Sequence, residues 1–95
     1  MKVSLSKEAQ TDALAAYHWY EERSPGLGAE FRLSLDATIH RISTHPFVYP
    51  EQHRGLRHTL VRRFPYAVYF RVSEDIILVV AVIHAKRHPA VARNR

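Results

Sequence analysis

The sequence contains no cysteine, and this absence excludes both disulfide bonds and thiolate metal ligands. It also lacks a long apolar run, because the longest, residues 76–83, is far shorter than the roughly 20 residues that cross a bilayer. The first residues, MKVSLSKEAQ, lack the apolar core of a signal peptide. We therefore expect no membrane segment and a single cytoplasmic domain spanning residues 1–95.

Acidic residues are scarce in the second half of the chain. Residues 51–95 carry 9 lysines and arginines against 3 aspartates and glutamates, whereas residues 1–50 carry 5 against 6. The formal net charge of +5 therefore arises in the C-terminal half. A basic half-domain predicts an acidic partner, either nucleic acid or an acidic protein segment. A solvated basic surface without a partner would show the same composition.

Apolar residues concentrate between positions 57 and 88, in three runs that predict three strands. The last run, Ile76 to Ile83, has no polar residue and is rich in β-branched side chains, which is typical of a strand buried on both faces. The short turn at residues 73–75 makes it the antiparallel neighbour of the preceding strand. Alternation in that preceding strand places Val68, Phe70 and Val72 on one face, and Ala67, Tyr69 and Arg71 on the other.

Two helices are predicted ahead of these strands. Ser6 supplies an N-cap for a helix over residues 7–23, which ends at Ser24-Pro25-Gly26. A second helix over residues 27–44 is stopped by Pro46. The short link between them predicts an antiparallel helix hairpin. The apolar stripe of the second helix consists of Leu27, Phe31, Leu35, Thr38, Ile39 and Ile42.

A short candidate strand at residues 2–5 completes the element order β-α-α-β-β-β. This order predicts an α+β fold in which the helix hairpin packs on one face of a small antiparallel sheet. Residues 47–55 are expected to form a loop, and the residues after Pro89 to have no defined structure. Because the hairpin covers only one face, we expect a partner segment or a second copy of the protein to cover the other face of strand 76–83.

Basic and aromatic side chains at the ends of the predicted strands are candidate binding groups. The planar fork of arginine suits phosphate and carboxylate groups, and tyrosines can stack on bases. The candidate cations are Arg57, Arg62, Arg63, Lys86 and Arg87, and the candidate tyrosines are Tyr66 and Tyr69. In strands, however, arginines and tyrosines more often serve solubility and packing.

The seven histidines do not predict a metal site. His84 and His88 are four residues apart, but the end of a strand and Pro89 argue against the helix that a ligand pair with this spacing requires. His84 would serve as a general acid or base, or more simply as a polar strand cap. With Arg63 and Arg87 it could supply the proton transfer and the charge that RNA cleavage needs. No glycine-rich phosphate loop is present, and no cofactor is expected.

Four segments together resemble the RelE/ParE superfamily of bacterial toxins, and most closely its ParE-like, plasmid-stabilisation branch. They are WYEERSPGLGAEF at residues 19–31, the loop around Pro46 and Pro50, LVRRFPYAVYFRV at residues 60–72 and VIHAKRHP at residues 82–89. The resemblance implies the toxin of a type II toxin–antitoxin module, which a cognate antitoxin neutralises in a hetero-oligomer. ParE-like toxins poison DNA gyrase, whereas RelE-like toxins cleave mRNA on the ribosome.

Two departures from the RelE-like pattern favour the ParE-like function, a gyrase inhibitor that is not an enzyme. The RelE-like branch has an arginine where this chain has Ala67, and a C-terminal tyrosine that is missing here after Tyr69; only its last arginine has a counterpart, Arg87. The first alternative is a ribosome-dependent, metal-independent endoribonuclease that uses Arg63, His84 and Arg87. The second alternative is a non-toxic basic binding module. The residues expected to bind the target or the antitoxin are Arg57, Arg62, Arg63, Tyr66, Lys86, Arg87 and His88.

Overall fold

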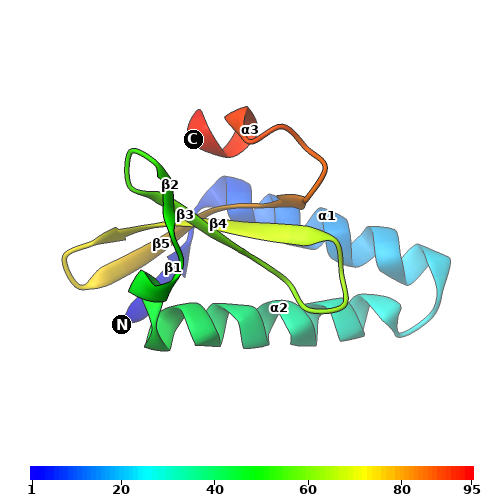
Figure 1. Cartoon of the computed structure of the whole chain (residues 1–95). Helices are drawn as coiled ribbons and strands as arrows, with labels where there is room; N and C mark the ends of the chain where they lie inside the picture. Colours follow the sequence, from blue (N-terminus) through cyan, green and yellow to red (C-terminus); the bar gives the residue numbers. More distant parts are fainter.

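A computed structural model describes residues 1–95 as two helices packed on a five-stranded sheet, with a short third helix on the opposite side (Figure 1). No helix is long and apolar enough to cross a membrane. The elements in chain order are β1 (Lys2–Leu5), α1 (Lys7–Arg23), α2 (Leu27–Thr44), the 3₁₀ turn η1 (Pro46–Val48), β2 (Glu51–His53), β3 (Leu56–Leu60), β4 (Tyr66–Ser73), β5 (Ile76–His84) and α3 (Ala90–Arg93).

Local signals set the ends of α1 and α2, and both predicted ranges are confirmed. The Ser6 hydroxyl accepts a hydrogen bond from the Ala9 N–H at 3.1 Å and so caps α1. At the turn between the helices, the Glu21 carboxylate accepts hydrogen bonds from the N–H groups of Gly26 and Gly28. Gly26 has φ +89°, which favours glycine, and a Cβ on Gly28 would lie 2.7 Å from the Tyr17 carbonyl oxygen. The P-G-L-G sequence therefore allows the two helices to approach closely.

The strands are arranged in the order β1-β5-β4-β3-β2, and the predicted α+β fold with a helix hairpin on the sheet is confirmed. Neighbours among β2 to β5 are antiparallel, but β1 lies parallel to β5, with Leu5 opposite Val79. Sequence-distant strands pair only through the tertiary fold, which is why this parallel contact escaped prediction. The expected loop at residues 47–55 is also partly wrong, because β2 lies within it and pairs with β3 across a turn at Arg54 and Gly55, both at positive φ.

The two faces of the sheet carry separate apolar cores. Helix residues Phe31, Leu35 and Ile42 pack with Val68 and Phe70 on one face, as alternation predicted. The other face contains Ala67 and Tyr69, again as predicted, together with Leu56, Val80, Ala81, Ile83 and Ala92. From Val79 to Ile83, β5 is buried on both faces, whereas Ile76 and Leu78 are each 38% exposed. The double burial predicted for this strand is therefore confirmed for its second half.

The residues after Pro89 do not lack structure, contrary to the sequence-based expectation. They form α3, which lies above the sheet in Figure 1, on the side opposite α2. Ala92 is fully buried there, and Val91 packs against the same core. The protein's own last turn of helix therefore covers part of the face for which a partner segment or a second copy was expected.

A β-bulge divides β5. Tyr69 of β4 lies opposite Ala81, whereas the next residue, Phe70, lies opposite Val79, so Val80 is the extra residue. Val80 and Ala81 consequently both belong to the core under α3, while Val79 and Val82 belong to the core over the helices. The bulge lies immediately after the last residue of β5 that pairs with β1, which is Val79.

Candidate functional site: the basic end of the sheet

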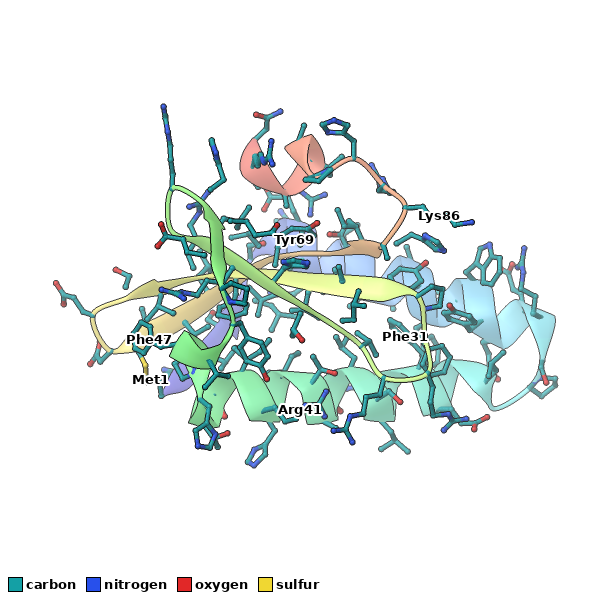
Figure 2. The ribbon with its side chains drawn as sticks, in the orientation of Figure 1. Met1, Phe31, Arg41, Phe47, Tyr69 and Lys86 are labelled. Carbon is teal, nitrogen blue, oxygen red and sulfur yellow. The ribbon has the colours of Figure 1, made fainter.

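Two loops meet at one end of the sheet and bring together most of the predicted binding residues. The Ala85 N–H donates a hydrogen bond of 2.8 Å to the Pro65 carbonyl, and Tyr66 lies opposite His84 across β4 and β5. Figure 2 shows Lys86 on the loop that leaves this end of the sheet. We call this region the basic end, and it comprises Arg62, Arg63, Tyr66, His84, Lys86, Arg87 and His88.

Tyr66 anchors the basic end to the core. Its ring centroid lies 5.2 Å from that of Phe31 and 5.6 Å from that of His84, both in edge-on geometry. Burial raises the pKa of the Tyr66 phenol; Arg87 acts in the opposite direction, and Asp12 adds to the rise. The phenol therefore stays protonated at neutral pH, where its hydroxyl can donate a hydrogen bond but cannot serve as a base.

The two histidines of the basic end hold the loop between β5 and α3. His84 Nδ1 accepts a hydrogen bond from the Lys86 N–H at 3.1 Å, and His88 Nδ1 accepts one from the Ala90 N–H at 3.0 Å. A backbone N–H can only donate, so both Nδ1 atoms act as acceptors and the neutral rings carry their proton on Nε2. The free nitrogen of His84 is then a donor, and the arrangement is that of a polar strand cap.

The cations of the basic end are all exposed, but they differ in whether they form an ion pair. Arg62, Lys86 and Arg87 are exposed. Arg63 is also exposed but lies 3.2 Å from Glu30 of α2, in a surface ion pair that contributes little to stability. Glu30 is thus a neighbour of the site that the strand pattern did not reveal, because it comes from a helix 33 residues earlier.

Two predicted binding residues lie elsewhere. Arg57 donates to the Tyr49 carbonyl at 2.7 Å and lies 3.9 Å from Glu51, so it fastens the segment around η1 to the sheet. Tyr69 is only 6% exposed and lies between the sheet and α3, so its ring offers no surface on which a base could stack (Figure 2). No group of three or more histidine, aspartate or glutamate side chains is placed to hold a metal ion.

His58 is a partly buried titratable group outside the basic end. Its ring stacks on Tyr69 with centroids 5.2 Å apart, and its Nδ1 is buried without a hydrogen-bond partner. Burial lowers the pKa of the His58 imidazole. The imidazole of His58 therefore binds a proton less readily in the folded protein than in the unfolded chain, where a histidine has a pKa of about 6.5.

We expect the free energy of unfolding to decrease as the pH falls below about 6.5, until the pH reaches the lower pKa of folded His58. A difference of one full proton between the unfolded and the folded state would give a slope of about 1.4 kcal/mol per pH unit. The slope for His58 should be well below this value, because the ring is only partly buried. Urea unfolding between pH 5 and 7.5 measures it. His58→Leu should flatten the curve, whereas His40→Ala, at an exposed position, should not. Parallel curves for the wild type and His58→Leu would contradict the assignment.

Comparisons with known proteins agree with this architecture. A family profile described as "ParE toxin of type II toxin-antitoxin system, parDE" matches residues 3–89. Toxin ParE2 of Mycobacterium tuberculosis, in strains CDC 1551 / Oshkosh and ATCC 25618 / H37Rv, is 27% identical over 81 residues, covering 84% of this chain and 77% of the relative. A solved structure, the "Chromosomal ParDE TA system from P. aeruginosa", matches with a TM-score of 0.79 and 18% identity, covering 88% of this chain and 95% of that chain.

The family profile extends from β1 to the end of the loop that carries the basic end. The resemblance to the RelE/ParE superfamily, and within it to the ParE-like branch, is therefore confirmed, and the structural match shows that the fold is shared. This chain belongs to the ParE toxin family and is the toxin of a type II toxin–antitoxin system.

Proposed function

We propose that this ParE toxin inhibits DNA gyrase by binding it through the basic end, without catalysing a reaction. Membership of a toxin–antitoxin family implies an antitoxin partner, and we propose that the antitoxin neutralises the toxin by covering the same basic end. Because gyrase acts on chromosomal DNA, the proposed place of action is the cytoplasm. Residues 1–95 would act there as one unit.

The hydrogen bond from the Lys86 N–H to His84 Nδ1 is the observation that supports binding rather than catalysis. RNA cleavage without a metal needs a base for the 2′-hydroxyl and an acid for the leaving oxygen. At the basic end, His84 Nδ1 is occupied and the phenol of Tyr66 stays protonated. The remaining side chains there are cations and hydrogen-bond donors, which suit recognition of an acidic surface.

The alternative is a ribosome-dependent mRNA endoribonuclease, and one observation favours it. The basic end gathers Arg63, His84 and Arg87, which are the cations and the imidazole that this chemistry would use. Rotation of the His84 ring in a complex would free Nδ1, and catalytic hydrogen bonds often form only with substrate bound.

Two assays of the purified protein distinguish a gyrase inhibitor from an mRNA endoribonuclease. In a supercoiling reaction with gyrase, we expect inhibition that His84→Ala weakens only in part, because binding energy is spread over a surface with few hot spots. In a translating extract, we expect the mRNA to stay intact. His40→Ala, which removes an exposed histidine from α2, is the matched control. Site-specific cleavage of ribosome-bound mRNA, lost by a factor of about 10²–10⁴ in a folded His84→Ala variant, would establish the ribonuclease instead.

A further inference from the structure

Asp12 of α1 and Arg95 form an ion pair that lies largely out of solvent. Arg95 donates to both carboxylate oxygens of Asp12, at 2.5 Å and 3.3 Å. The side chains of Arg95 and Asp12 are 21% and 13% exposed, respectively. Hydrogen bonding to Asp12 raises the pKa of Arg95, so the guanidinium stays charged at any physiological pH. A charge-assisted pair with this geometry is stronger than an ordinary surface ion pair.

The same two side chains complete the hydrogen bonding of β5 at its bulge. Asp12 accepts from the Val82 N–H at 3.0 Å, and Arg95 donates to the Val80 carbonyl at 3.1 Å. The pairing of β5 with β1 ends at Val79, so backbone groups beyond this point have no strand beside them on that edge. Part-buried backbone groups need partners, and here the partners are the side chains of Asp12 and Arg95, with the Ser6 hydroxyl as a longer donor to the Val80 carbonyl at 3.5 Å. We call this arrangement, the two side chains and the two backbone groups, the clamp.

The clamp fastens the tail, which we define as residues 85–95. Helix α3 has only four residues and is far too short to be stable by itself. It is held by the packing of Ala92 on the core of the second face and by Arg95 beyond its end. Lys86 and Arg87 lie between β5 and α3, so their loop is fixed on one side by the strand and on the other by the clamped helix.

We propose that Asp12 is a positioning residue for the toxin, which acts through Arg95 to hold the basic loop at residues 86–88 in its binding geometry. This inference rests on the proposed role of the basic end as the binding surface. Asp12 itself is not part of the basic end, and its hydrogen bonds to the tail are those with Arg95. Without the clamp, Lys86 and Arg87 would still be present, but their loop would adopt many conformations. Binding would then have to order the loop, and this loss of conformational entropy would weaken the affinity.

Hydrogen exchange of the full chain and a titrated growth-arrest assay in cells test this role. In Asp12→Asn and in Arg95→Gln, the amides of residues 91–95 should exchange about tenfold faster, because a charge-assisted hydrogen bond shifts a local equilibrium by at least that factor. Growth arrest should require about tenfold more toxin. The amides of α1 and α2 should keep their protection, since the asparagine side chain in the Asp12→Asn variant can still accept from the Val82 N–H.

Three further variants test whether Asp12 and Arg95 position the basic loop or only stabilise the whole fold. Arg95→Lys keeps the charge and a single donating nitrogen, and should restore part of the protection and of the toxicity. Arg93→Gln removes an exposed arginine of the same tail that has no ion pair, and should behave as the wild type. The double variant Asp12→Asn/Arg95→Gln should be no worse than Arg95→Gln, because that substitution already removes both the ion pair with Asp12 and the hydrogen bond to the Val80 carbonyl.

Unchanged exchange at residues 91–95 in both single variants would overturn the proposal. Full toxicity in a variant whose tail exchanges faster would overturn it as well. Neither readout involves gyrase, so a wild-type protein that arrests growth without inhibiting gyrase would refute the proposed target and leave the test of the clamp intact.

Discussion

Replacing Phe31 by alanine should lower the free energy of unfolding by about 3–5 kcal/mol. Phe31 is 1% exposed, and its ring lies within 5.4 Å, centroid to centroid, of three other aromatic rings. The substitution would leave a cavity between α2 and the start of β4 that rigid aromatic neighbours cannot fill. Small domains have only about 5–15 kcal/mol of stability in total, so this single change should bring the protein close to unfolding.

Urea and thermal unfolding, followed by circular dichroism, measure this effect. Leu33→Ala is the matched control, because it removes an aliphatic side chain from the same helix at a position that is 70% exposed. Its effect should stay within about 0.5 kcal/mol. A Phe31→Ala variant as stable as Leu33→Ala would show that the aromatic cluster is not the centre of the core. Because Tyr66 packs on Phe31, the same variant should also lose toxicity at temperatures where it is still folded.

Reversing two charges of the basic end should have the largest effect on association. In Arg62→Glu/Arg87→Glu, we expect the rate of association with the antitoxin to fall about 10- to 1,000-fold at low ionic strength, because complementary charge steers encounters. The two arginines are exposed, whereas Arg63 is already paired with Glu30 and is the poorer choice. Surface plasmon resonance with the purified cognate antitoxin measures the rate.

Two comparisons show whether the position of the reversed charges matters or only the net charge of the protein. One varies the ionic strength, and the other uses a control variant with the same change of net charge. The reduction should shrink as ionic strength rises, since exposed charges are screened beyond about 8–10 Å at physiological salt. Lys2→Glu/Arg32→Glu reverses two exposed cations on β1 and α2, outside the basic end, and should slow association much less. Equal rates for the two double variants would mean that net charge alone matters and that the antitoxin does not approach through the basic end.

Several features of this toxin follow from short-range rules that the sequence displays directly. Ser6 and the Ser24-Pro25-Gly26 turn determine where α1 begins and ends, because capping and φ restriction act within one turn of helix. Alternation over β4 determines that Val68 and Phe70 face the helices while Ala67 and Tyr69 face away. The family resemblance is also visible in short motifs, at residues 19–31, 60–72 and 82–89.

The tertiary structure alone determined the remaining features, and each depends on contacts between distant residues. The parallel pairing of β1 with β5 joins residues that are 74 positions apart in register, and Arg95 meets Asp12 across 83 positions. The sequence does not distinguish Arg57 from the other candidate binding cations. In the fold it donates to the Tyr49 carbonyl and so holds the segment around η1. A bulge that adds one residue opposite Tyr69 leaves no mark in an unbroken apolar run. Periodicity and capping describe interactions over about four residues, so pairings across the whole chain, and the clamp that depends on them, are decided only when the sheet has formed.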